Sequence, residues 1–323
     1  MNTTRIALVA AFALLATGQV MAQSSNSSGK KGGSVGGTDT EVIDLSSSIT
    51  VPPLRSWMSP EIGNAWRQGY QGQRTTITVI DDFASGRLLK GNLQGTSQSL
   101  HHGEWTRMQS SLVAPLATVA AQDFSATRSV TLGTGFNVLN LSYGMMATAG
   151  LSTINWSSRE QSIIAYARDG RAVISKSAGN DGNTVAVGQT NSSGRVDYLG
   201  RDLIGAQSAI FVGALSTNGT TRSPASIASY SNVAGTNAAV QKQFLVVGVE
   251  GSKTGLYGTS FAAPIVSGYA AIVSSKFTTA TPTAVANQLL NTARQDTIRS
   301  YNPAIHGRGE ASIARALAPT GIQ

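Results

Sequence analysis

The sequence of 323 residues contains no cysteine and only three histidines, His101, His102 and His306. The absence of cysteine excludes disulfide bonds, thiolate catalysis and the zinc sites that are built on cysteine. Three histidines leave little material for a histidine-rich metal centre, and no His-Glu-x-x-His pattern occurs. The sequence therefore argues against a metal site built on cysteine or histidine, and we expect His306 to be a structural or surface residue.

Charge is also scarce, because only 12% of the residues are Asp, Glu, Lys or Arg. The 24 basic and 16 acidic residues give a formal charge of +8, but no long basic run occurs. The longest basic cluster, Lys30-Lys31, lies in a tract of Gly and Ser. This excess does not argue for a nucleic-acid partner, and we expect none. The apolar content of 41% is sufficient for a sizeable core.

Long apolar runs are missing as well, since no stretch approaches the ~18 residues of a membrane span. A short apolar run at residues 6–15 follows Arg5 and precedes Val20-Met21-Ala22, a small-x-small cleavage pattern. This arrangement is typical of a secretory signal peptide. We predict a signal peptide over residues 1–22, cleaved after Ala22, and a mature chain that is secreted or periplasmic. Residues 23–49, rich in Ser, Gly and Thr, are predicted to be a flexible arm.

Alternating strand and helix patterns follow over the remaining residues, 50–323. β-branched and apolar runs predict strands at residues 76–80, 138–142, 173–177, 209–215 and 244–249. Helical spacing and capping residues predict helices from residue 60, over 159–168, from near 260, from 282, and after 309. Such alternation is typical of an α/β protein.

A serine at residue 260 stands between a glycine-rich turn and an apolar helical pattern. Gly255 and Gly258 permit sharp turns, and Thr259 or Ser260 can cap the helix expected to follow. Pro264 suits only the first turn of a helix, which supports a start near Ser260. Amide groups at that end would point at a developing oxyanion. We therefore predict that Ser260 is a nucleophile, the alternative being an ordinary helix-capping serine.

Residues 258–264, Gly-Thr-Ser-Phe-Ala-Ala-Pro, resemble the nucleophile signature G-T-S-x-A-x-P of the subtilisin-like serine peptidases, the subtilases. Asp81 ends an expected strand, as the aspartate of that family does, and His102 is followed by glycine, as in its His-Gly motif. The string Ser-Ala-Gly-Asn that ends at Asn180 matches the segment carrying the family's oxyanion-hole asparagine. The order Asp81, His102, Ser260 is that of subtilisin.

The resemblance implies a doubly wound α/β fold, with a mostly parallel sheet between helices on both faces, and a peptidase domain over residues 50–323. It implies a serine endopeptidase in which His102 is the general base for Ser260 and Asp81 orients the imidazole. Asn180 and the Ser260 amide would stabilise the oxyanion. The implied substrate-binding residues are Ser142, Tyr143, Gly144, Ser177, Ala178 and Gly179.

The implied partners are protein or peptide substrates, and catalysis by such a site needs no cofactor. Structural calcium is common in the family and stays open as an alternative here, although no acidic loop stands out to bind it. A folded pro-domain usually lies between signal peptide and catalytic domain, and residues 23–49 leave no room for one. Residues 113–117, Val-Ala-Pro-Leu-Ala, resemble the V-A-P-x-A entry into the family's next core strand, so the resemblance implies a strand over residues 116–121. Only about a dozen residues separate positions 124 and 136, where the family has a crossover helix, so we expect a shortened connection.

Two residues beside the implied site depart from the family pattern. Phe83 stands where glycine is usual, and Glu104 replaces the threonine that follows His-Gly. A carboxylate at Glu104 could raise the pKa of His102 or bind a cation. Asp82 and His101 stay as outside candidates for the acid and the base. These departures motivate an alternative function, a catalytically silent secreted binding protein on the same fold; a secreted esterase using the same serine is a third.

Overall fold

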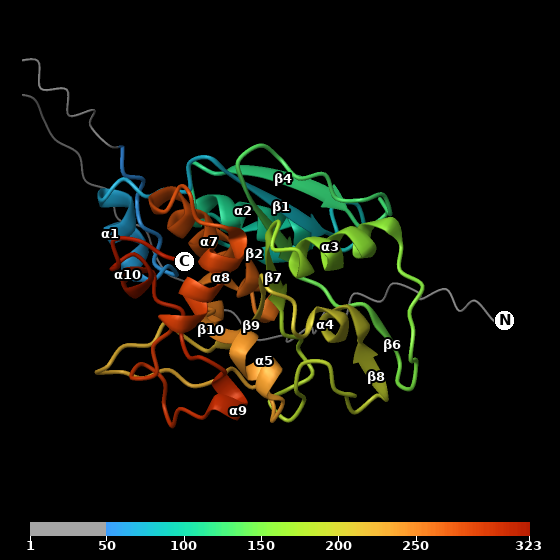
Figure 1. Cartoon of the computed structure of the whole chain (residues 1–323). Coiled ribbons are helices and arrows are strands. Elements are labelled where there is room, and N and C mark those ends of the chain that lie inside the picture. The colour runs from blue at the N-terminus through green and yellow to red at the C-terminus, as the bar shows by residue number, and fades with distance from the viewer. Residues whose placement is uncertain (1–49) are drawn as a thin grey trace, which may run out of the picture.

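The computed structural model describes residues 50–323, and the predicted signal peptide and arm lie outside the described residues. A six-stranded sheet in the order β10-β9-β7-β5-β1-β4 forms the centre of this part of the chain (Figure 1). All its neighbouring strands are parallel. Its strands are β1 (Thr75–Asp81), β4 (Thr118–Asp123), β5 (Phe136–Leu141), β7 (Val173–Ser177), β9 (Ala209–Leu215) and β10 (Phe244–Gly248).

Helices cover both faces of the sheet. Successive residues of a strand point to opposite faces, so most strands contribute apolar side chains to two cores. Val138 belongs to one hydrophobic core and Leu139 to the other. The first core contains residues of α1 (Pro60–Arg67), α2 (His102–Val113), α7 (Ala263–Lys276), α8 (Pro282–Asn291) and α10 (Ile313–Ala316). The second contains residues of α3 (Ser158–Arg168), α4 (Tyr198–Leu203) and α5 (Ala238–Gln243). The fold is therefore the doubly wound α/β sandwich that the sequence predicts.

Smaller elements complete the described chain. Two antiparallel pairs lie outside the central sheet: β2 (Leu89–Gly91) with β3 (Gln98–Leu100), and β6 (Met146–Thr148) with β8 (Arg195–Asp197). Short helices are α6 (Gly251–Thr254), α9 (Pro303–His306) and the 3₁₀ turn η1 (Thr259–Phe261). The β6–β8 register pairs Met146 with Asp197, which brings this carboxylate beside the segment that follows β5.

Several predicted boundaries are confirmed, and the start of one strand differs from the prediction. β7 and β9 have the predicted bounds, and Ser59 caps α1 by accepting a bond from the Glu61 amide. The strand predicted from residue 116 begins only at Thr118. The Leu116 amide instead donates to the Gln71 carbonyl at 2.9 Å, which holds residues 116 and 117 in a turn.

The connection from β4 to β5 contains no helix over residues 124–135, as the short spacing predicts. The buried guanidinium of Arg159 stabilises it by donating from Nη1 to the Phe124 carbonyl at 2.6 Å. Gln122 donates to the carbonyl groups of Ala126 and Arg128. Side chains from the flanking elements thus take the place of an ordered crossover helix.

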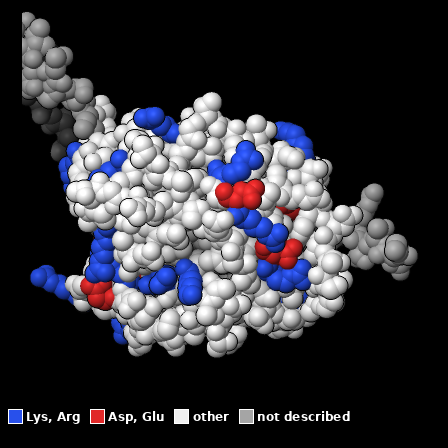
Figure 2. Space-filling model, in the orientation of Figure 1, with Lys and Arg blue, Asp and Glu red and all other residues white. Residues whose placement is uncertain are grey.

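On the face of the molecule that Figure 2 shows, charged side chains do not gather in one place. Figure 2 shows Lys and Arg in separate groups on the visible face, some of them beside Asp or Glu, without a continuous basic surface.

Within the described range, no helix combines the length and the apolar character that crossing a membrane requires.

Candidate active site

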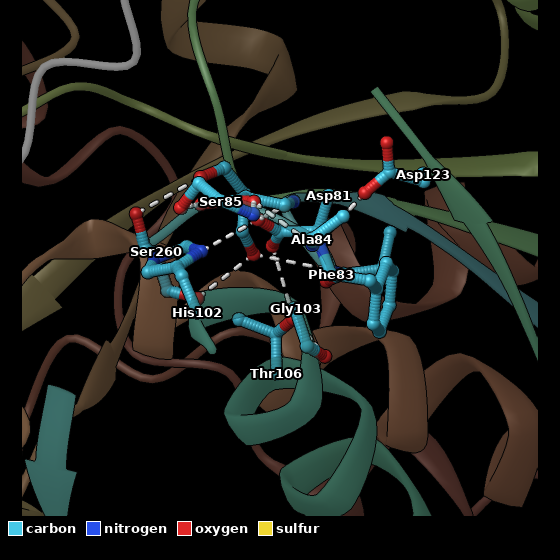
Figure 3. A network of polar contacts seen from close by, with 12 residues as sticks. Asp81, Phe83, Ala84, Ser85, His102, Gly103, Thr106, Asp123 and Ser260 are labelled. Carbon is cyan, nitrogen blue, oxygen red and sulfur yellow. Dashed lines mark hydrogen bonds and ion pairs between the residues drawn. The ribbon is translucent and has the colours of Figure 1, made fainter. Parts of the chain in front are cut away.

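Asp81 ends β1 as a fully buried carboxylate that accepts bonds on both oxygens. Its Oδ1 lies 2.6 Å from His102 Nδ1 and also accepts the Asp82 amide at 2.7 Å. Its Oδ2 accepts the hydroxyl of Thr106, on α2, at 3.0 Å (Figure 3). A buried carboxylate needs such partners, and these fix its orientation toward the imidazole.

Asp82 has a different environment, although it is the neighbouring carboxylate. Its oxygens accept bonds from the Ala84 and Ser85 amides and from the Ser85 hydroxyl, which closes a tight turn. Burial alone would raise the pKa of Asp82, but the bonds from Ser85 and Ala84 outweigh it and leave the pKa below its usual value. Of the two candidates, Asp81 is the one that contacts His102.

His102 is the first residue of α2, and its ring is buried between Asp81 and the serine turn. The His102 ring centroid lies 5.4 Å from that of Phe261, the residue after Ser260. The neighbouring candidate His101 precedes the helix, and its backbone amide donates to the Glu104 carboxylate at 3.0 Å. Glu104 is therefore a helix-capping residue at the start of α2, which accounts for its presence there.

Phe83, the other departure from the family pattern, packs on the start of α2. A Cβ added to Gly103 would lie 2.8 Å from the Phe83 ring and 2.8 Å from the Asp82 carbonyl oxygen. Figure 3 shows the phenyl ring directed away from Ser260. Phe83 therefore fills space behind the Asp81–His102 pair, and only a glycine at position 103 allows this close packing.

Ser260 lies in the single 3₁₀ turn η1, partly exposed, and not at the N-terminus of the α-helix as the sequence predicts. The expected capping by Thr259 or Ser260 is wrong, because α7 begins at Ala263 and both side chains bond elsewhere. The Ser260 hydroxyl donates to the Ser142 carbonyl at 3.0 Å, and the Ser142 hydroxyl donates to the Ser260 carbonyl at 2.8 Å. These reciprocal bonds tie η1 to the end of β5. Gly258, with φ 121°, makes the turn before it.

Asn180 follows β7 and is held by the residue before Ser260. Its Oδ1 accepts the Thr259 amide at 2.8 Å and the Thr259 hydroxyl at 3.0 Å. Because two donors identify that atom as the carbonyl oxygen, the amide nitrogen occupies the other position. The site thus combines a carboxylate–imidazole pair, a hydroxyl on a tight turn and a fixed amide donor group.

A cavity of about 190 Å³ adjoins Ser260 and Asn180. All six residues predicted to bind substrate line it: Ser142, Tyr143, Gly144, Ser177, Ala178 and Gly179. Sequence reasoning missed Lys176 and Asp197, which also line it. Lys176 could have been noticed, because it is a charged residue inside the otherwise uncharged pattern of β7. No local motif marks Asp197.

Metal ligands do not gather near this site. In residues 50–323, no group of three or more His, Asp or Glu side chains could hold a metal ion. His306 lies apart from the site, buried beneath Tyr301, with Nδ1 at 3.1 Å from the Asn302 carbonyl oxygen. It is a structural residue.

Comparison with known proteins gives one family match and several structural matches. The model of the subtilase family matches residues 109–309, which include Asn180 and Ser260 and begin after Asp81 and His102. No curated protein sequence matches the chain closely enough to count as a relative.

Two solved structures are similar to this fold. The prenylagaramide maturation protease PagA aligns with a TM-score of 0.52 at 20% identity, over 80% of this chain and 98% of that one. A lanthipeptide protease aligns with a TM-score of 0.51 at 18% identity, over 78% of this chain and 90% of that one. At such identities the similarity concerns the fold.

Proposed function

Because the chain belongs to the subtilase family and is a serine-type peptidase, we propose that it hydrolyses internal peptide bonds of proteins through an acyl-enzyme on Ser260. The observation that carries this proposal is the 2.6 Å contact between His102 Nδ1 and Asp81 Oδ1 beside η1. It supports an assignment of the acid and the base that the family match, which begins at residue 109, does not include.

His102 is the general base in this proposal. An ionised Asp81 carboxylate can only accept hydrogen bonds, so it favours the tautomer with the proton on Nδ1 and leaves Nε2 as the basic nitrogen. His102 takes the proton of Ser260 as the hydroxyl attacks the peptide carbonyl, and returns it to the leaving amine. Asp81 stabilises the imidazolium that forms between these two steps.

Asn180 stabilises the oxyanion in this proposal, together with the Ser260 amide. Its carbonyl oxygen is held by two bonds from Thr259, which fixes the NH₂ group before the substrate arrives. A donor that needs no reorganisation during the reaction is worth several kcal/mol, about 2.7–4 when one such donor is removed from an oxyanion hole.

The Ser260 hydroxyl donates to the Ser142 carbonyl at 3.0 Å, so its proton must be redirected before attack. A backbone amide of a bound peptide can donate to the same carbonyl and displace the hydroxyl. Substrate binding would then turn the Ser260 proton toward His102. This step gives residues 142–144 a role in activation as well as in binding.

Hydrolysis of casein and of a peptide anilide by the purified mature protein tests the proposal. Wild type should hydrolyse both, and Ser260→Ala should hydrolyse neither. An esterase would cleave a matched ester but leave the anilide intact. Undiminished peptide capture by Ser260→Ala, without turnover by wild type, would instead identify a catalytically silent binding protein.

Export of the enzyme is part of the proposal, since its N-terminus has the pattern of a signal peptide. N-terminal sequencing of protein recovered outside the cytoplasm should begin at Gln23. A mature protein that retains Met1 in the cytoplasm would contradict export without affecting the catalytic assignment.

A further inference from the structure

A buried ion pair lies in the wall of the cavity beside Ser260. Lys176 Nζ is 2.8 Å from Asp197 Oδ2, with side chains that are 1% and 18% exposed. The ammonium also donates to the Ser177 carbonyl at 2.8 Å. A lysine within a buried strand is costly unless it is paired, so the position of Asp197 is required by that of Lys176.

The Asp197 carboxylate occupies a space that two glycines keep open. A Cβ on Gly144 would lie 3.2 Å from Asp197 Oδ2, and a Cβ on Gly200 would lie 3.0 Å from the same atom. Neither glycine has a positive φ, so backbone conformation does not require glycine at these positions. The other oxygen, Oδ1, accepts the Met145 amide at 2.8 Å. The surroundings are therefore shaped to hold a carboxylate.

The walls of the cavity connect this ion pair with the nucleophile. Ser142 bonds to Ser260, and three residues later Met145 bonds to Asp197. Sites for whole small molecules usually occupy ~300–1,000 Å³. The cavity of about 190 Å³ is smaller, and suits one amino-acid side chain. A side chain that enters it from a peptide on Ser260 meets the ion pair.

The charges of Lys176 and Asp197 cancel inside the cavity. A cationic substrate side chain would lose its hydration in the cavity without gaining an unpaired anion as a partner. An anionic substrate side chain would be repelled by the Asp197 carboxylate. Each Asp197 oxygen accepts one bond in the structure and keeps lone-pair capacity for a further donor. A second acid, Asp181, lines the cavity too, but it is exposed and accepts bonds from Asn191 and Asn232. Solvent screens its charge more strongly.

We propose that the Lys176–Asp197 pair selects an uncharged side chain with a hydrogen-bond donor, such as Gln or Asn, at P1. P1 is the substrate residue whose carbonyl carbon Ser260 attacks, so this inference rests on the proposed peptidase function. Lys176 neutralises the cavity, and Asp197 accepts the bond from the P1 side chain. The pair thereby rejects both signs of charge in one cavity.

Four peptides that differ only at P1, with Gln, Met, Glu or Lys, test this in the wild-type protein. These side chains are similar in length and differ in charge and donor capacity. A fluorophosphonate probe first measures the fraction of active Ser260. We expect the highest kcat/KM for Gln, and values at least about tenfold lower for Glu and Lys. Cleavage of the Lys or Glu peptide as fast as the Gln peptide would overturn the inference. Faster cleavage of the Met peptide than of the Gln peptide would also overturn it.

Substitution of each partner should change the preferred charge. Lys176→Met leaves the Asp197 carboxylate unpaired, so the Lys peptide should gain relative to the Gln peptide. Asp197→Asn leaves the Lys176 ammonium unpaired, so the Glu peptide should gain. The double variant is neutral again and should restore the wild-type order. Lys242→Met makes the same chemical change on the exposed part of α5 and should leave the order unchanged.

The outcomes separate the two levels of the proposal. Absence of probe labelling in wild type contradicts the peptidase function, and the inference falls with it. Labelling with a different order of the four peptides contradicts only the role of the ion pair. If a single variant fails to fold, the wild-type series and the double variant still decide.

Discussion

His102 Nδ1 lies 2.6 Å from Asp81 Oδ1, although both residues lie outside the segment that matches the family model. Asp81 is the last residue of β1, and His102 is the first residue of α2, which packs on one face of the sheet. This packing brings the two side chains together. Thr106, one turn further along α2, bonds the second carboxylate oxygen. The carboxylate–imidazole pair is thus a product of the fold, assembled from residues on two elements.

Asp81→Asn should lower kcat by about 10⁴, because an amide can donate to Nδ1 and favour the wrong imidazole tautomer. Asp82→Asn is the matched control, since Asp82 contacts the turn at Ala84 and Ser85 and not the imidazole. It should lower stability while kcat per labelled Ser260 stays near the wild-type value. Equal losses in the two variants would contradict the assignment of Asp81.

Asn180→Ala should lower kcat by about 10²–10³ with little change in KM, as expected for a donor that acts in the transition state. Thr259→Val removes the hydroxyl bonds to the Asn180 carbonyl oxygen and to the Gly179 backbone, and keeps the bond from the Thr259 amide to Asn180. Its loss of kcat should be smaller. Steady-state kinetics on one peptide anilide measure both, and a loss confined to KM would argue against an oxyanion role.

Gly103→Ala should destabilise the protein by about 1–3 kcal/mol, the usual cost of overpacking. The new methyl group would lie 2.8 Å from the Asp82 carbonyl oxygen and 2.8 Å from the Phe83 ring. Gly86→Ala is the control, because a Cβ there meets no atom within 4 Å. Thermal unfolding should show a lower Tm for Gly103→Ala only. Equal Tm values would mean that the packing behind His102 is loose.

His306 should make stability depend on pH. Burial lowers the pKa of His306, although the Asn302 backbone acts in the opposite direction. As the pH falls through about 6.5, the unfolded chain takes up the proton before the folded one does, so the free energy of unfolding declines. His306→Gln should flatten this decline in urea titrations between pH 7.5 and pH 5, whereas His101→Gln should retain it. A decline unchanged by His306→Gln would contradict this account.

The sequence predicts most of the sheet, because its strands are short β-branched or apolar runs that turn residues interrupt. β7 and β9 have the predicted bounds for this reason. The serine helix α7 begins at Ala263, near the predicted start, but neither residue expected to cap it does so, because long-range bonds take both side chains: Thr259 bonds to Asn180, and Ser260 bonds to Ser142. Local propensity cannot anticipate such partners.

Some residues of the candidate site could likewise be predicted from the sequence, and others could not. Asp81, His102, Asn180 and Ser260 stand in recognisable motifs, and the structure brings them to one region. Lys176 and Asp197 have no motif, since their pairing depends on the β6–β8 register that sets Asp197 beside Met146. The sequence thus predicts six residues that line the cavity, whereas the Lys176–Asp197 ion pair depends on the tertiary structure.

The most direct test of the account is fluorophosphonate labelling of the mature protein, followed by intact mass measurement and peptide mapping. Wild type should gain one adduct, on Ser260, at a rate that falls strongly in His102→Ala. Ser260→Ala should gain none. Labelling that persists in Ser260→Ala, or a wild-type protein that remains unlabelled, would contradict the claim that Asp81 and His102 activate Ser260.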